Sequence, residues 1–163
     1  ESQEKKKFSL ESFLRRVFKG VLDTVAKGFI KTGLGRRIAY NIMGKIGDSS
    51  LKLGYALTLS DLVIAPATPS NTARAGGVLF PIVKGLCAAF DSEPGKTARK
   101  VGAYLMQTTF QANAVTSAMF MTAMAANPLV ANLAKSTLGI DISWGLWTLA
   151  ASVPGIASLL VVP

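Results

Sequence analysis

The sequence predicts an all-α integral membrane protein, and three observations support this fold class. Residues 101–134 and 142–163 contain no charged residue, and an apolar run of at least ~18 residues without charges is long enough for a transmembrane helix. Half of the 163 residues are apolar, and the mean hydropathy is +0.38. Many of the Lys and Arg residues behind the net charge of +9 lie in short segments between apolar runs, as in the cytoplasmic loops of membrane proteins. A soluble protein with very apolar core helices is the alternative.

The composition argues against several classes of function. The chain has no histidine, which removes the commonest general base and the commonest metal ligand. Its single cysteine, Cys87, cannot form an internal disulfide. Asp61 is the only carboxylate deep in an apolar run, so no acid–base pair can be assembled, and the basic residues lack the interleaved aromatics of a nucleic-acid surface. We therefore expect no enzyme activity, no metal, no cofactor and no nucleic-acid partner.

The N-terminal part is charged and amphipathic. Residues 1–8 are expected to form a disordered, charged leader, and the missing Met and signal peptide suggest a fragment or a processed chain. In residues 9–52, apolar side chains at helical spacing form one stripe: Leu14, Val17, Phe18, Val21, Leu22, Val25, Phe29 and Ile30. The charges on the other faces favour a helix in the membrane interface, although an ordinary surface helix fits equally well. The segment "TGLGRR" should end this helix, and a basic loop should follow.

Residues 53–90 are expected to form a re-entrant helical hairpin. Two apolar segments, 53–70 and 73–90, would each be about 27 Å long as a perfect helix, barely a span. Both contain residues that interrupt or weaken a helix: Asp61, Pro66, Pro69, Gly76, Gly77 and Pro81. The chain should therefore enter the membrane, turn at residues 69–72 and leave on the same side, although two short full spans would also return there.

The remaining elements follow from charge and from the apolar runs. The segments on either side of the hairpin are basic and should share the cytoplasmic face; the second is the loop 91–100. Residues 101–134 should form a transmembrane helix that is broken near Asn127 and Pro128. Residues 142–163 should form a final transmembrane helix, with Trp144 and Trp147 at the membrane interface.

The segment "APATPSNTARAGG", residues 65–77, carries the functional signal. Irregular polar backbone is tolerated at membrane depth only inside protein or beside a water-filled cavity, and broken helices there can hold ions and carboxylates. Hydroxyl and amide groups donate and accept hydrogen bonds, an Arg can grip a carboxylate, and glycines let the backbone approach a solute. The candidate residues are Ser70, Asn71, Thr72, Arg74, Gly76 and Gly77.

Several blocks, in order, resemble one family of membrane transporters. Besides "APATPSNTARAGG", these are "KGFIKTGLGRRIAY", "LGYAL", "TSAMFMTAMAANPL", "SWGLW" and "VPGIASLLVVP". They are similar to the divalent anion:sodium symporter family, above all to its exchanger branch of bacterial citrate:succinate and tartrate:succinate antiporters and plastid 2-oxoglutarate/malate translocators.

The resemblance implies roles for individual residues. In that family the Ser-Asn-Thr motif lies at the tip of a re-entrant hairpin and contacts a substrate carboxylate, which assigns Ser70, Asn71 and Thr72 as substrate or ion ligands. The family's next helix is also broken and faces the same site. Here it contains "QANAVTS", so the further candidates are Gln111, Asn113, Thr116 and Ser117, although such side chains also serve as plain interhelical hydrogen bonds.

The resemblance also implies half of an inverted-repeat elevator transporter that exchanges malate, succinate, 2-oxoglutarate or citrate. Its partners would be the substrate, the lipid bilayer and the missing second repeat or a partner chain, with a homodimer as the complete form. A bacterial inner membrane is the favoured location, and the plastid inner envelope is the alternative. Residues 11–26 are more charged than the family's scaffold helix, and the second Ser-Asn-Thr hairpin is absent. A structural membrane subunit or a degenerate half-transporter is therefore the alternative function.

Charge compensation gives two further expectations. A dicarboxylate in a poor dielectric needs a counter-charge, which a symporter can take from sodium and an exchanger from a fixed cation. Arg74 would supply it, predicting exchange without sodium, unless it points to a backbone carbonyl or a headgroup. Asp61 lies nine residues before Asn71, about 13 Å along a helix, so we expect a solvated carboxylate near the interface in preference to a pair with Arg74.

Overall fold

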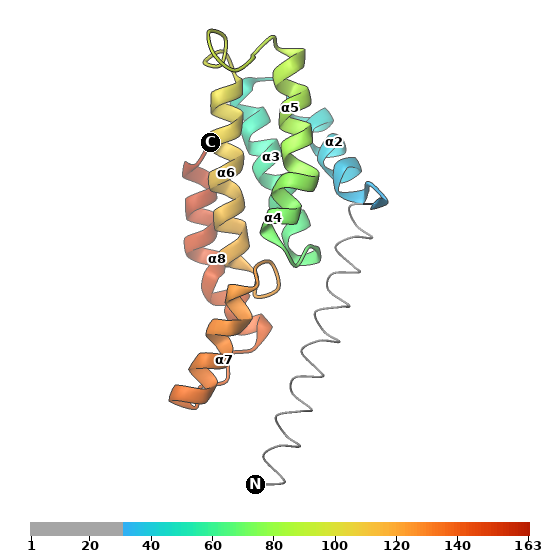
Figure 1. The fold of residues 1–163 in the computed structure, drawn as a ribbon. Helices are drawn as coiled ribbons and strands as arrows, with labels where there is room; N and C mark the ends of the chain where they lie inside the picture. The colour runs from blue at the N-terminus through green and yellow to red at the C-terminus, as the bar shows by residue number, and fades with distance from the viewer. Residues whose placement is uncertain (1–30) are drawn as a thin grey trace.

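The computed structural model describes residues 31–163, which form helices joined by turns and short loops, with no strand in that range. Helices α3, α5, α6 and α8 run roughly alongside one another, and α7 extends from the lower end (Figure 1). The leader 1–8 and the amphipathic stripe predicted in residues 14–30 lie outside the described residues.

The first described helix, α2 (Leu34–Ile46), begins after Gly33, whose φ of 67° is a conformation that favours glycine. Its buried residues Gly35, Ala39 and Met43 recur every fourth position and so share one face, which packs against α3 (Ser50–Ile64). This stretch was expected to be a basic loop. The expectation was wrong because a helix can carry its exposed basic residues on the face opposite the buried one.

A helical hairpin occupies the stretch where a re-entrant hairpin was predicted. Helix α3 runs unbroken to Ile64, continues into a short 3₁₀ turn (Ala65–Ala67) and ends where the prolines begin. After the turn at residues 68–70 the chain is helical again through α4 (Asn71–Arg74), a π-helical segment (Ala75–Leu79) and α5 (Phe80–Ala89). The two arms are antiparallel, and both open ends lie at the upper end in Figure 1. The two glycines lie in this π-helical segment, and the second arm is not broken there.

The core lies among α2, α3, the second hairpin arm and α6. Its fully buried apolar side chains include Leu57, Ile64, Val83 and Leu105. Helices α3 and α6 approach closely at Gly54, where an added Cβ would collide with the ring of Tyr104. Small residues at such crossings are typical of helix packing in membranes.

The predicted broken helix is present, but its break lies earlier than expected. Helix α6 (Gly102–Met119) ends before a short irregular segment, residues 120–125, and α7 (Ala126–Leu138) follows. Pro128 therefore lies in the first turn of α7, where the missing N–H leaves no helix bond unmade. The prediction of a break at Asn127 and Pro128 was wrong because it read a helix-starting proline as a helix-ending one.

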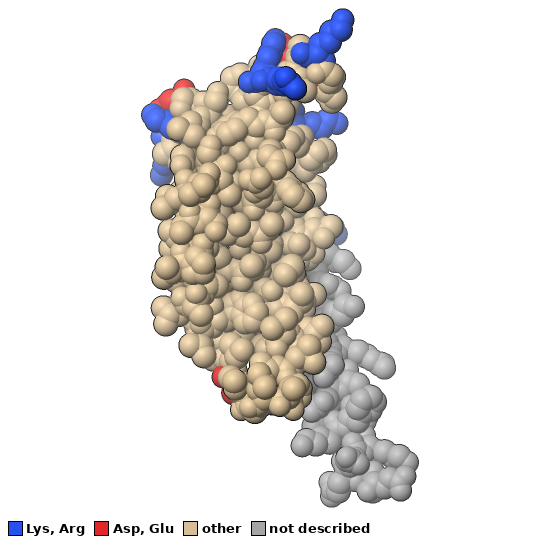
Figure 2. Space-filling model, turned by 90° about the vertical axis from the view of Figure 1, so that its left-hand side faces the viewer, with Lys and Arg blue, Asp and Glu red and all other residues tan. Residues whose placement is uncertain are grey.

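The last helix, α8 (Trp144–Val161), matches the predicted span closely. Of the described helices it is the one long and apolar enough to cross a membrane. Its apolar side chains are largely exposed, for example Leu149 at 71% and Val153 at 76%. Figure 2 shows an uncharged body on this side of the molecule, with Lys and Arg gathered at the upper end. This distribution fits a helical body in lipid with a basic cytoplasmic end.

Candidate functional site

Two irregular segments meet at the lower end of the bundle. The first is the hairpin tip, residues 68–72, which joins the turn to the first two residues of α4, and the second is the α6 break, residues 120–125. The hydroxyl of Thr122 donates to the carbonyl of Pro66 at 3.3 Å, and the amide of Asn71 lies 4.0 Å from the sulfur of Met124. The hairpin tip and the α6 break, represented by Asn71 and Met124, are 53 positions apart in the sequence and are in contact in the fold.

The hairpin tip keeps hydrogen-bonding capacity that nearby groups do not use. Ser70 caps α4 by accepting from the N–H of Ala73 at 3.3 Å. The side-chain oxygen Oδ1 of Asn71 accepts from the N–H of Thr72 at 2.8 Å. The side-chain nitrogen Nδ2 faces only a thioether sulfur, which is a weak acceptor. The tip is also the N-terminal end of a helical run that continues to Ala89. The helix dipole favours an anion at this N-terminal end.

Behind the tip lies a buried ion pair. Nε of Arg74 is 2.6 Å from Oδ1 of Asp61, and the two side chains are 0% and 1% exposed. The expectation of a solvated Asp61 near the interface was therefore wrong. It measured distance along a single helix, whereas the hairpin turn brings the second arm back beside the end of α3.

The other guanidinium nitrogens of Arg74 are also engaged. Nη2 donates to two side-chain oxygens of α6, Ser117 Oγ at 2.7 Å and Thr116 Oγ1 at 3.3 Å, and Nη1 donates to the carbonyl of Thr68 at 3.4 Å. Thr116 in turn donates to Oδ2 of Asp61 at 2.5 Å. The cation is thus held by a carboxylate, two hydroxyls and a carbonyl.

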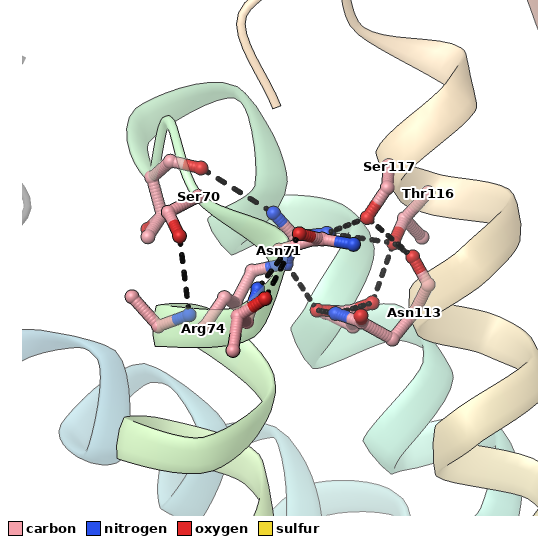
Figure 3. Close-up of polar contacts among 10 residues, drawn as sticks. Ser70, Asn71, Arg74, Asn113, Thr116 and Ser117 are labelled. Atoms are coloured by element: carbon pink, nitrogen blue, oxygen red, sulfur yellow. Dashed lines mark hydrogen bonds and ion pairs between the residues drawn. The ribbon is translucent and has the colours of Figure 1, made fainter. Parts of the chain in front are cut away.

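Asn113 completes this cluster. Its side-chain amide lies between both charged groups and can face either of them. In one orientation the amide nitrogen is 3.4 Å from each Asp61 oxygen. With the amide turned by 180°, its oxygen accepts instead from Arg74 Nε at 3.3 Å and Nη2 at 3.2 Å. Asn113, Thr116 and Ser117 share one face of α6 because they are three and four residues apart, and Figure 3 shows them pointing toward Arg74.

The structure therefore divides the predicted site residues into groups. Arg74, Asn113, Thr116 and Ser117 come together in the buried cluster, while the motif 70–72 forms the partly exposed tip beside it. Gly76 and Gly77 lie one turn further on in the π-helix, and the space beside Gly76 is open. Gln111 does not join either group: it is exposed and lines a shallow surface hollow with α8.

Two residues that organise the α6 break were not anticipated. A helix end leaves carbonyls unpaired, and here side chains supply the donors. Asn127 Nδ2 donates to the carbonyls of Ser117 at 2.7 Å and Phe120 at 2.9 Å, and Trp147 Nε1 donates to the carbonyl of Ala118 at 2.9 Å. For Asn127, the sequence offered one indication of this role, because the residue directly precedes Pro128 at the start of a helix. Trp147 had been predicted only as an interfacial anchor.

An apolar cavity of about 420 Å³ lies away from this site. It is lined by one side of α5, the loop 91–100 and the start of α6, among them Phe80, Cys87 and Met106. The loop beside it is organised by Ser92, whose hydroxyl accepts from the N–H groups of Val101 and Gly102 at 3.3 and 2.9 Å. Its polar groups are few, so the hairpin tip, with its convergent amides and hydroxyls, remains the stronger candidate for a charged solute.

A polar hairpin tip facing a broken helix, within a largely apolar helical body, is typical of a membrane transport protein. A family model described as the sodium:sulfate symporter transmembrane region matches residues 10–163. The chain belongs to this family, as its motifs suggested, and is therefore an integral membrane protein of a transporter family and not an enzyme.

Three similar proteins are named as bacterial or chloroplast transporters. The putative malate transporter YflS of Bacillus subtilis is 54% identical over 140 residues, which cover 85% of this chain and 29% of that protein. Dicarboxylate transporter 1 of the spinach (Spinacia oleracea) chloroplast is 56% identical, with 85% and 24% covered. An L-tartrate/succinate antiporter of Escherichia coli is 44% identical, with 83% and 28% covered. The chain spans less than a third of the length of these relatives.

Proposed function

We propose that the complete protein exchanges di- and tricarboxylates such as malate, succinate, 2-oxoglutarate or citrate across a membrane, and that the hairpin tip binds a substrate carboxylate. The observation that carries this proposal is the side-chain amide nitrogen of Asn71, which has only a thioether sulfur as its partner and lies at the N-terminal end of a helical run, beside the α6 break. The names of the relatives, a malate transporter, a dicarboxylate transporter and a tartrate/succinate antiporter, support the substrate class.

At the tip, each group would contribute differently to binding. The amide nitrogen of Asn71 and the hydroxyl of Thr72 would donate to the carboxylate, and such charge-assisted hydrogen bonds are stronger than neutral ones. Ser70 would cap the start of the helix and so hold its N-terminal end, where the helix dipole favours an anion, beside the substrate. Gly76 and Gly77 would keep the side of the helix open to the rest of the substrate.

The counter-charge for the substrate would come from outside the described residues. Arg74 is paired with Asp61, so the two charges cancel before a substrate arrives. The same contacts bear on sodium, because Arg74 occupies the carboxylate and hydroxyl oxygens nearest the tip, the ligands that a hard cation would need. We therefore keep sodium-independent exchange as the proposal and assign the positive charge to the rest of the polypeptide.

The larger architecture belongs to the same proposal. The hairpin would be re-entrant, since both of its open ends lie at one end of the bundle (Figure 1) and basic residues gather there (Figure 2). A second, inverted repeat with its own Ser-Asn-Thr hairpin would complete the site, in a homodimer whose transport domains move by an elevator mechanism. The relatives are long enough for such a repeat, because this chain covers at most 29% of each one compared above.

Exchange can be measured with the complete transporter in proteoliposomes. Labelled succinate or malate should enter vesicles loaded with unlabelled dicarboxylate and should not enter empty vesicles, with equal rates in sodium and in choline buffers. Uptake into empty vesicles that is driven by a sodium gradient would replace the exchange proposal with symport. Absence of uptake for every dicarboxylate and for citrate would remove the substrate class.

A further inference from the structure

The Asp61–Arg74 pair holds the hairpin in place, and its contacts do not suit a substrate ligand. Every nitrogen of the Arg74 guanidinium already has an oxygen partner within 3.4 Å, and the side chain is fully buried. To grip a substrate, Arg74 would have to abandon Asp61, a carboxylate that is 1% exposed. An unpaired charge at that depth is strongly unfavourable.

The contacts of this pair join three parts of the fold. Asp61 belongs to α3, Thr116 and Ser117 to α6, and Arg74 to the start of the second hairpin arm. Arg74 also holds the carbonyl of Thr68, which is itself fully buried in the tip. The position of the tip relative to α6 therefore depends on an ion pair that lies behind it.

We infer that Asp61 and Arg74 are positioning residues: their neutral pair fixes the hairpin tip against α6, and neither side chain contacts the substrate. This inference rests on the proposed function only in taking the tip as the place where the carboxylate binds. It replaces the expectation that Arg74 compensates the substrate charge. It makes the net charge of the pair, which is zero, the property that matters, and not the identity of either residue.

Transport by paired variants of the complete protein distinguishes positioning from binding. Asp61→Asn and Arg74→Gln should each lower the kcat/KM of exchange at least about 100-fold, because each leaves one buried charge alone. The double variant Asp61→Asn/Arg74→Gln has no buried charge and should return to within about tenfold of the parent, the residual loss reflecting weaker neutral hydrogen bonds. If Arg74 bound the substrate, the double variant would be as inactive as Arg74→Gln, and that result would overturn the inference.

A labelling experiment tests the position of the tip without using transport. Thr68→Cys places a thiol at a buried tip position whose hydroxyl has no partner among the described residues. The native Cys87, buried in the same hairpin, serves as the internal control. The background has every cysteine outside this segment replaced by serine, and alkylation by a maleimide is timed in proteoliposomes.

The single charge variants should raise the alkylation rate of Thr68→Cys at least about tenfold while leaving that of Cys87 unchanged, and the double variant should return it to the parental rate. An unchanged rate in the single variants would contradict positioning. Equal acceleration at both thiols would mean that the whole hairpin unfolds, which also contradicts a local role. Because these rates require no substrate, they test the inference even if exchange is not observed.

Discussion

Arg74 and Asp61 are 13 residues apart in the sequence, and their side chains meet at 2.6 Å inside the protein. The contact closes the hairpin on itself next to the turn. A buried pair of this kind adds little stability over apolar residues of similar size, but removing one partner is costly because the other charge remains buried. The pair therefore makes the fold sensitive to single substitutions at both positions.

The first prediction concerns the stability of the complete protein. Asp61→Asn should lower the free energy of unfolding by about 3–5 kcal/mol. The matched control is Asp48→Asn, which breaks the exposed pair between Asp48 and Lys52 and should cost under about 1 kcal/mol. Thermal unfolding in detergent, followed by tryptophan fluorescence, compares the two. Similar losses for both variants would show that Asp61 is not buried as described.

The second prediction concerns the hairpin tip. Asn71→Ala removes the donor proposed to contact the carboxylate and should raise the KM for dicarboxylate exchange about 10- to 100-fold, the range expected for a hydrogen bond to a charged group. Asn41→Ala, which changes an exposed asparagine on α2, is the control and should leave the KM unchanged. A parental KM in Asn71→Ala would remove this residue from the site.

The third prediction concerns the α6 break. Asn127→Ala removes the donor to the carbonyl of Ser117, while the carbonyl of Phe120 keeps the N–H of Ala123, and should cost about 1–3 kcal/mol. Trp147→Phe keeps most of the ring but loses the single bond to Ala118, so its effect should be smaller. Denaturant titration ranks the variants, and a larger loss in Trp147→Phe would mean that packing, and not carbonyl satisfaction, holds the break.

The fourth prediction concerns the crossing of α3 and α6. Gly54→Ala places a methyl group against Tyr104 and should destabilise the protein by about 1–3 kcal/mol, as overpacking does. Gly44→Ala, at a helical position with open space, should be neutral or stabilising because alanine favours helices. The same unfolding assay compares them. Combining Gly54→Ala with Tyr104→Leu should recover part of the loss, since the obstructing ring is gone.

The sequence predicted the elements whose limits depend on local chemistry. Prolines end α3 where a turn was expected, and the uncharged run at the C-terminus forms α8 almost as predicted. The sequence did not predict contacts between residues that only the tertiary fold brings together. The partner of Asp61 became visible only once the hairpin had closed, and the role of Asn127 depends on carbonyls freed at a break several residues away.

The candidate site shows the same division. The motif "SNT" was found from its polarity within an apolar stretch, and its place at a hairpin turn follows from the flanking prolines and helices. Arg74 was selected for its charge, yet its contacts could not be read from the sequence, because Asp61, Thr116 and Ser117 come from two other helices. Asn113, Thr116 and Ser117 were selected only through the resemblance to the transporter family, and the structure places them on one face of α6 beside Arg74.

The central claim is that the hairpin tip binds the carboxylate, and substrate protection of an engineered thiol tests it most directly. Gly76→Cys lies one turn beyond the tip, and Gly85→Cys lies further along the same helical run; both glycines have open space beside them. With Cys87 replaced by serine in the complete transporter, succinate or malate should slow maleimide labelling of Gly76→Cys in proportion to its occupancy, while acetate has no effect and Gly85→Cys labels at a constant rate. Equal labelling of Gly76→Cys with and without saturating dicarboxylate, in a protein that still exchanges it, would contradict the account.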